Sequence, residues 1–275
     1  MKDTIHLICP LCGQPLQQDT KRLFCPQHHS FDTARQGYSN LLPVRQKHSL
    51  NPGDTKEMLL ARRRFLDKGF YEPISRHVAE AFRRYLPPPS TQPPIIADIG
   101  CGEGYYTAFL QQACQADMIG LDIAKDGVRM ACSRNKNIVW LVATASKLPI
   151  AAASLDGVCA MFSLFLPEEY ARVLKKDGCA VEVTVGSDHL RELKAIIYEE
   201  VFEQHKHPAP CGDLFTEVLC TEQRFSLTLP QEDLQSLLQM TPHFWRIRQD
   251  RRQQLARIGS LTLTAHYWLR VLRKR

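Results

Sequence analysis

Long apolar runs are missing from this 275-residue sequence, and we expect no amino-terminal leader. No stretch reaches about 18 consecutive apolar residues, so we expect no transmembrane helix. The segment from Met1 to Leu7 is too short and too polar for a secretory signal peptide. Internal repeats and low-complexity tracts are missing as well. Together these absences predict a cytoplasmic protein with a core of its own and no part in a membrane.

Positive charge is modest in total but unevenly placed along the chain. Hydrophobic residues make up 44% and charged residues 23%, which is ordinary for a protein with a real core. The formal net charge is +6, and the basic residues gather at Arg62–Arg64, Arg83–Arg84, Arg246–Arg252 and Arg270–Arg275. Such clusters favour a polyanionic partner, although a solvated basic surface explains any single cluster equally well.

The ten cysteines divide into two groups. Seven are scattered and often stand beside apolar residues, so in a reducing compartment we expect core thiols rather than disulfides. The other three follow metal-ligand spacing, as Cys9-x2-Cys12 and then Cys25, with His28 and His29 just behind. Zinc takes four nitrogen or sulfur ligands in a tetrahedron, so the pattern predicts a structural Zn2+ site that either histidine completes. A module this small buries little core, so the ion should supply much of its folding free energy.

Alternating apolar and amphipathic segments predict the organisation of the chain. A proline-rich stretch at Leu86–Pro94 is expected to be a stiff linker. We therefore expect a zinc module at residues 1–45, a helical connector and linker at 46–94, and an α/β domain at 95–275. The expected strands of that domain are Ile95–Ile99, Asp117–Asp122, Ile138–Val142, Leu155–Phe162, Gly178–Val185, Phe225–Leu229 and Leu261–Leu269. The expected helices are Tyr105–Cys114, Ala124–Arg134, Pro167–Lys175, His189–Gln204 and Leu234–Met240. This alternation predicts a doubly wound, Rossmann-like parallel sheet with helices on both faces.

A glycine-rich turn directly follows the first expected strand of this domain. It reads Asp98-x-Gly100-x-Gly102-x-Gly104, with its third glycine one position too early for the dinucleotide fingerprint. The spacing is instead that of S-adenosylmethionine methyltransferases of the doubly wound class. Glycines there let the backbone approach a cofactor without Cβ clashes, at the carboxyl ends of the strands.

Asp122 strengthens this interpretation. It ends the second strand about twenty residues beyond the glycine turn, where a carboxylate can accept hydrogen bonds from both ribose hydroxyls. A helix N-cap is the alternative role, and the two roles are compatible. The segment Ala143–Pro149 resembles the stretch that lies along the adenine in such enzymes.

Motifs along the whole chain resemble the RlmA-type 23S rRNA (guanine-N1)-methyltransferases. The resemblance is carried by Cys9–Cys12, Cys25–His29, Gly37–Pro43, Asn51–Asp54, Ala61–Arg63, Gly69–Pro73, Asp98–Thr107, His189–Lys194 and Leu238–Pro242. It implies a zinc site at Cys9, Cys12, Cys25 and His29, so that His29 rather than His28 is the fourth ligand. The cofactor contacts that it implies, together with the glycine turn and the ribose carboxylate, are Tyr71, Gly100, Gly102, Glu103, Asp122 and His189. It also implies a guanine in a 23S rRNA hairpin as substrate and a homodimer with a basic cleft. One departure is Met161–Pro167, where the family would have a Pro-Cys-bearing segment at the substrate face.

The chemistry of methylation leaves the catalytic residues open. Guanine N1 carries a proton at neutral pH, which a positioned base or a water must accept. The candidate bases are Glu168, Glu169, Glu182 and His189, and the sequence does not choose among them. Phe162 or Tyr106 can stack on an extruded guanine, although core packing is the more ordinary role of either ring.

Two other functions fit parts of the sequence. One is a methyltransferase for a small molecule with the zinc module as an appendage. The other is a non-catalytic zinc protein that binds RNA. The basic clusters argue against the first, and the intact glycine turn with Asp122 argues against the second.

Overall fold

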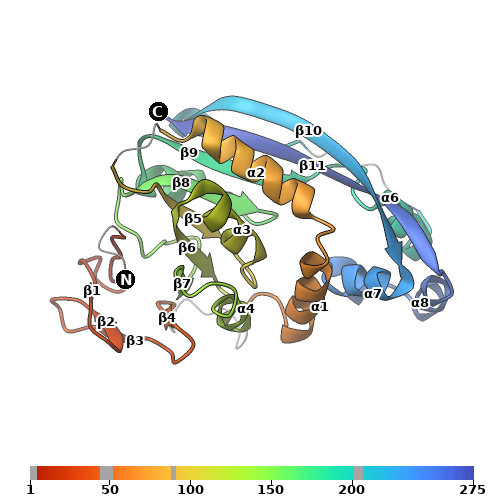
Figure 1. Ribbon diagram of the computed structural model, residues 1–275, viewed down its shortest axis with the longest axis horizontal. Coiled ribbons are helices and arrows are strands. Elements are labelled where there is room, and N and C mark those ends of the chain that lie inside the picture. Colours follow the sequence, from red (N-terminus) through yellow and green to blue (C-terminus); the bar gives the residue numbers. More distant parts are fainter. Residues whose placement is uncertain (1–4, 44–51, 88–90, 201–206) are drawn as a thin grey trace.

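A mixed eight-stranded sheet forms the centre of the computed structural model (Figure 1). The structure describes residues 5–43, 52–87, 91–200 and 207–275. The sheet has the order β10-β11-β9-β8-β5-β6-β7-β4. The pairs from β9 to β4 run parallel, whereas β11 is antiparallel to both β9 and β10. The strands are β4 (Tyr38–Asn40), β5 (Ile95–Ile99), β6 (Asp117–Asp122), β7 (Val139–Val142), β8 (Leu155–Met161), β9 (Leu174–Val185), β10 (Phe215–Pro230) and β11 (Ser260–Lys274).

Helices follow most of these strands. The α-helices are α1 (Lys56–Asp67), α2 (Glu72–Tyr85), α3 (Tyr105–Cys114), α4 (Lys125–Ala131), α5 (Pro167–Val173), α6 (Arg191–Ile197), α7 (Gln231–Gln239) and α8 (Gln249–Ala256). Two short 3-10 turns, η2 (Gly212–Leu214) and η3 (Pro242–Trp245), precede β10 and follow α7. Among the described residues, no helix is long and apolar enough to cross a membrane.

Each face of the sheet carries a hydrophobic core of its own. In β5, Ile96 packs into the first core, whereas Ala97 and Ile99 pack into the second, as side chains of a strand alternate. The first core takes buried residues from α1, α2, α3, α4, α6, α7 and α8. The second is covered by α5 and by the amino-terminal module, with Leu7 and Leu23 among its buried residues. Helices thus lie on both faces, and the module completes the second layer.

The amino-terminal module is a small hairpin sheet of β1 (Gln17–Gln18), β2 (Arg22–Phe24) and β3 (Ser30–Asp32). An isolated bridge joins Leu7 to Ile150, and β4 pairs in parallel with β7. Residues of the expected 1–45 module therefore also supply the edge strand of the large sheet. The expected boundary at residue 45 lies outside the described residues, as does the middle of the expected linker, residues 88–90.

The connector expected to be helical consists of two helices. Thr55 caps α1 by accepting a hydrogen bond from the Met58 N–H at 3.3 Å. The break before α2 contains Gly69 at φ +79. Such a left-handed residue is a common way to end a helix. The helix expected at His189–Gln204 begins at Arg191 and ends at Ile197, and its expected last residues belong to 201–206, outside the described chain.

The carboxyl-terminal strands differ most from the sequence prediction. The stretches expected as Phe225–Leu229 and Leu261–Leu269 are parts of β10 and β11, which pair over most of their length. Because both run antiparallel, the sheet is mixed rather than wholly parallel. The early part of β10 escaped prediction since it lies at the sheet edge. The exposed Glu222 and Arg224 there interrupt the apolar pattern.

Candidate active site and metal centre

A cavity of about 1070 Å3 lies at the carboxyl ends of β5, β6 and β8. The chain passes from β5 outward to β6 and β7 and then returns to β8 on the other side of β5, so the cavity occupies the switch point of the sheet. Ligand pockets for one small molecule span about 300–1,000 Å3. This cavity is therefore large enough for a nucleoside cofactor together with part of a second substrate.

The glycine loop between β5 and α3 forms one wall. Gly102 has φ +55, and the nearest atom to a Cβ there is the Arg62 Nη1 at 3.4 Å, so its backbone is open to the cavity. Gly104, at φ +85, faces the protein instead. A Cβ at that position would lie 2.7 Å from the Cβ of Ala131 and 2.8 Å from the Trp140 ring. Gly102 therefore leaves room for a ligand, and Gly104 lets α3 pack closely on α4 and β7.

Asp122 ends β6 opposite this loop. Its carboxylate accepts hydrogen bonds from the Gly102 N–H at 2.8 Å and from the Ala124 N–H at 2.7 Å. Burial raises the pKa of Asp122, and the two N–H donors oppose that shift. Ala124 rather than Asp122 is the N-cap residue of α4, so the carboxylate holds the turn ahead of the helix. The same side chain lines the cavity.

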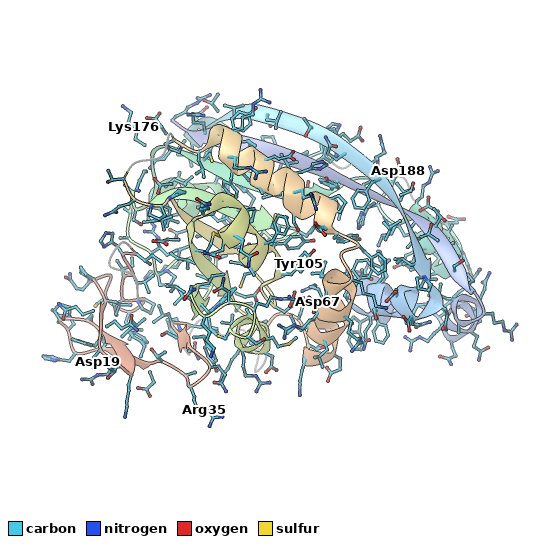
Figure 2. The ribbon with its side chains drawn as sticks, in the orientation of Figure 1. Asp19, Arg35, Asp67, Tyr105, Lys176 and Asp188 are labelled. Atoms are coloured by element: carbon cyan, nitrogen blue, oxygen red, sulfur yellow. The ribbon has the colours of Figure 1, made fainter. Side chains whose placement is uncertain are left out.

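Glu103 is held by cations beside the cavity. Its carboxylate accepts a hydrogen bond from Arg134 Nε at 2.6 Å and lies 3.6 Å from Arg63 Nε. Burial raises the pKa of Glu103, while the charge of Arg134 opposes the rise. Arg134 also stacks on Tyr105 at 5.5 Å and pairs with Asp67 at 2.8 Å, and Figure 2 labels these two residues near each other. The ion-pair network thus fixes the glycine loop to α1 and α3.

Tyr71 and His189 meet across the cavity from segments far apart in sequence. The Tyr71 hydroxyl lies 3.3 Å from His189 Nε2, and the His266 N–H donates to His189 Nδ1 at 3.2 Å. Because Nδ1 accepts, the ring proton of the neutral imidazole sits on Nε2. Desolvation lowers the pKa of His189 to about 3, and burial raises the pKa of Tyr71. Tyr71 therefore accepts from His189 and keeps its own O–H to donate into the cavity.

Phe162 directly follows β8 and, at 37%, is more exposed than the three tyrosines that also line the cavity, Tyr71, Tyr105 and Tyr106. Its φ is +54, a left-handed conformation that costs a non-glycine residue about 1–3 kcal/mol. The backbone is held there by its N–H, which donates to the Val183 carbonyl at 2.9 Å. Its ring centroid lies 6.4 Å from that of Tyr106 and 6.5 Å from that of Tyr71. The fold thus keeps one aromatic ring facing the cavity in a strained backbone.

The four candidate bases do not share the cavity. Glu168 is exposed on α5, Glu169 accepts hydrogen bonds from Arg172 and the Leu148 N–H, and Glu182 is paired with Arg270. His189 does line the cavity. Its Nδ1 is occupied by a backbone donor and its Nε2 carries the proton, so it presents no free acceptor. These positions select no base among the four.

The metal centre lies in the amino-terminal module. Ligand atoms of Cys9, Cys12, Cys25 and His29 all lie within 4.8 Å of one another. Cys9 Sγ and Cys25 Sγ are each 3.5 Å from His29 Nδ1, and Cys12 Sγ is 3.6 Å from Cys25 Sγ. Bonds of about 2.0–2.3 Å to a tetrahedral zinc place the ligand atoms about 3.3–3.8 Å apart, so the donor set fits that ion.

Local backbone turns explain which histidine joins this cluster. The Gly13 N–H donates to the Cys9 carbonyl at 2.8 Å, and the His28 N–H donates to the Cys25 carbonyl at 2.9 Å. His28 has φ +61 and is exposed, whereas His29, one residue further, enters the cluster. The structure thus places His29, which the resemblance implied as the fourth ligand, beside the three cysteines and leaves His28 outside the cluster.

All six residues predicted to contact the cofactor line the cavity, namely Tyr71, Gly100, Gly102, Glu103, Asp122 and His189. Sequence reasoning missed two parts of the lining. Arg62, assigned to a surface basic cluster, pairs with Asp54 at the cavity wall. The segment from Met240 to His243, together with Arg246, forms another part. Arg62 lies inside the motif Ala61–Arg63 and the start of the second part lies inside Leu238–Pro242, so the family resemblance was the available signal.

Comparisons with known proteins agree with this geometry. Residues 7–50 match the family described as RlmA, N-terminal, a zinc ribbon, and residues 96–178 match a methyltransferase domain. The chain is 33% identical to a protein of Micromonospora griseorubida, with 94% of this chain and 92% of that protein covered. It is 30% identical to a protein of Bacillus subtilis (93% and 93% covered). Both are named as 23S rRNA (guanine-N(1)-)-methyltransferases. It is also 32% identical to the 23S rRNA (guanine(748)-N(1))-methyltransferase of Streptomyces fradiae, with 93% and 91% covered.

Proposed function

The chain belongs to the 23S rRNA (guanine-N1)-methyltransferases, and from this membership we propose that it methylates N1 of a guanine in a hairpin loop of 23S rRNA. The observation that carries the proposal is similarity at 30–33% identity over about 93% of the chain. That span includes the zinc ribbon and the cavity alike, so neither part is an unrelated appendage.

S-adenosylmethionine is the methyl donor, and the cavity residues fit it. The bound cofactor supplies an electrophilic methyl group on a sulfonium. The open backbone at Gly102 offers a close approach, and Asp122 offers acceptor lone pairs for ribose hydroxyls. The Tyr71 O–H, oriented by neutral His189, suits an anionic group such as the methionyl carboxylate. These residues bind and orient the donor, and alignment of donor and acceptor is the main catalytic need of a direct displacement.

The acceptor base is proposed to lie against Phe162. A loop guanine is unpaired, so it can be splayed out and stacked on an aromatic side chain at small cost. Phe162 fits this role better than Tyr106 because Phe162 is more exposed in the cavity lining. Since none of the four candidate carboxylate and imidazole bases offers a free acceptor there, water bound beside N1 is the proposed first proton acceptor.

The zinc module is proposed to grip the RNA rather than to take part in the chemistry. A Cys3His shell leaves a tetrahedral zinc closed to substrate, which suits a structural role. We further propose that the protein acts in the cytoplasm, where its ribosomal substrate is made. Homodimerisation is part of the proposal as well. Among the described strands β10 is an outermost one, and a sheet edge can pair with a second copy.

The two rival functions are weaker on specific observations. A small-molecule methyltransferase has no need of a zinc ribbon that extends the second core of its sheet. A non-catalytic RNA-binding protein has no need of a strained Phe162 beside an open glycine loop.

Transfer of labelled methyl from S-adenosylmethionine to unmodified 23S rRNA tests the proposal. We expect label in the rRNA, with the modified position mapped to N1 of one loop guanine by primer-extension arrest and mass spectrometry. A Phe162→Ala variant serves as the matched low-activity sample. Label on a small molecule only, or no label on any rRNA, would refute the proposal. The mapped position also identifies the guanine.

A further inference from the structure

An arginine-rich segment follows α7 and ends before β11. Residues 242–257 form η3 and α8. They contain five arginines and a single carboxylate, namely Arg246, Arg248, Arg251, Arg252, Arg257 and Asp250. The segment therefore carries a strong excess of positive charge, which suits a polyanion.

Trp245 stands at the start of this segment with 66% of its surface exposed. Its ring lies edge-on to Phe244, with the centroids 5.1 Å apart. The Arg252 guanidinium lies over the Phe244 ring, 4.7 Å from its centroid, and Nη2 of Arg252 donates to the Phe244 carbonyl at 3.2 Å. Phe244 is thus clamped from α8, and it supports an indole that remains open to solvent. A supported, exposed aromatic ring among arginines is the arrangement on which unpaired bases stack.

The segment adjoins the cavity. Pro242, His243 and Arg246 belong to its lining. The Tyr198 hydroxyl lies 2.7 Å from His243 Nδ1, which ties the segment to the end of α6. In Figure 1, α7 and α8 lie at the end of the molecule away from β1–β3. A strand of RNA whose base enters the cavity therefore has Trp245 next to it, on the side away from the zinc module.

The cluster at Arg270–Arg275 does not share this position. Arg270 is 3% exposed and its side chain donates a hydrogen bond to Glu182. Arg273, on β11, is the strand-pairing partner of Cys179, which lies in the first half of β9. The cavity lies instead at the carboxyl end of β9, where Val185 and His189 belong to its lining. Figure 2 marks the two ends with Lys176 and Asp188, which are well separated.

The other two clusters are also less suited to contact a strand that enters the cavity. Arg83 and Arg84 end α2, which lies beside Arg273 through its hydrogen bond to the Tyr85 carbonyl at 3.4 Å. In the remaining cluster, Arg62 and Arg63 are paired with carboxylates of the cavity wall and the glycine loop. The third arginine of that cluster, Arg64, is exposed but does not line the cavity, and it donates to the Gln239 side chain at 3.4 Å. Within the described residues, Arg246 is the one arginine of the four clusters that is both exposed and part of the cavity lining.

We propose that the arginine-rich segment is a docking surface for single-stranded RNA beside the target nucleotide. Trp245 stacks on an unpaired base next to the target, and Arg246 binds an adjacent phosphate. The inference deepens the proposed function, because it names how that same site receives its RNA, and it rests on that function.

Binding of a labelled hairpin of the 23S rRNA, with its unpaired loop intact, tests the proposal by fluorescence anisotropy over a range of salt concentrations. Trp245→Ala is expected to weaken binding about tenfold, the loss of one stacked base, without changing the salt dependence. Arg246→Ala is expected to reduce the slope of log K against log salt by about 0.7. Trp245→Phe should recover most of the affinity, which excludes misfolding as the cause. Arg83→Ala is the matched control at the opposite end of the sheet, with wild-type binding.

A blunt duplex of the same stem provides the second probe. Because it has no unpaired base, its affinity should not change in Trp245→Ala. The proposal is overturned if Trp245→Ala binds the hairpin as wild type does, or if the loss is equal for the duplex. It is also overturned if Trp245→Ala converts a dimer into a monomer in sedimentation, since the surface then belongs to a second copy. Methyl transfer to rRNA by the wild type, measured in parallel, separates the outcomes. Transfer with no effect of Trp245→Ala on hairpin binding removes this inference alone, whereas absence of transfer removes the proposed function.

Discussion

Asp122 accepts the N–H of Gly102 at 2.8 Å, so the end of β6 holds the glycine loop that follows β5. The other carboxylate oxygen accepts the Ala124 N–H at 2.7 Å. One side chain therefore fixes two turns that border the cavity before any ligand arrives. Such preorganisation lowers the entropic cost of ordering the loops when a ligand binds. Removal of Asp122 should therefore weaken cofactor binding in two ways, through loss of the proposed ribose acceptor and through loss of the ordered glycine loop.

Replacement of Asp122 by Ala is expected to weaken S-adenosylmethionine binding about 10- to 100-fold. A hydrogen bond to a charged group contributes about 1.5–3 kcal/mol, and the variant also frees the glycine loop. Isothermal titration calorimetry measures the change. Asp126→Ala removes an exposed carboxylate from the first turn of α4 and should bind as wild type does. Unchanged affinity in Asp122→Ala would disprove the ribose role.

His189 predicts a specific pH dependence of stability. Its pKa in the folded protein is lowered from 6.5 to about 3 by desolvation, so the unfolded chain binds its proton first as the pH falls. Stability is fully present above pH 6.5 and declines from there toward pH 3, by up to about 1.4 kcal/mol per pH unit for this one group. In urea titrations at pH 7, 6, 5 and 4, His189→Asn should reduce the slope of the unfolding free energy against pH by the contribution of this one proton. Equal slopes for wild type and His189→Asn contradict the assignment.

Loss of the metal is expected to affect RNA before cofactor. Chelation, or Cys12→Ser, removes the ion that joins two turns of the module, so the module should unfold first. Hairpin affinity then falls, while S-adenosylmethionine affinity changes less because the metal ligands are not part of the cavity lining. Circular dichroism, anisotropy and calorimetry on the same samples follow the three effects. Cys220→Ser replaces a thiol outside the cluster, on β10, and should change none of them. RNA binding that survives metal removal would show that the module is not the grip.

Local spacing predicted the parts of the site that neighbouring residues build. The three zinc-spaced cysteines, the glycine turn and Asp122 each belong to a short motif, and the structure brings them to the places that those motifs imply. Spacing alone left His28 and His29 open as the fourth ligand, and only the family resemblance implied His29. Contacts between residues far apart in the sequence could not be predicted in this way. Arg270 reads as a basic surface residue, yet it is buried against Glu182, 88 positions away. The rim of the cavity near Arg246 depends on how α7 and α8 fold back between β10 and β11, which no local pattern encodes.

Phe162 gives the last prediction, because its strained backbone and its ring can be tested separately. Phe162→Ala should lower kcat/KM for rRNA by about 5- to 150-fold, the range for loss of one stacked base, and leave S-adenosylmethionine affinity within twofold. Phe162→Tyr keeps a stacking ring and should retain most activity. Leu164→Ala removes an aliphatic side chain that also lines the cavity and is 75% exposed, and we expect it to lower activity much less than Phe162→Ala does. If Leu164→Ala is as damaging as Phe162→Ala, the turn needs apolar contact rather than an aromatic ring. Phe162→Gly tests the backbone strain separately from the ring. Glycine adopts φ +54 without strain, so this variant should unfold at a higher temperature than Phe162→Ala. Neither variant has an aromatic ring to stack on the guanine, so both should be equally inactive.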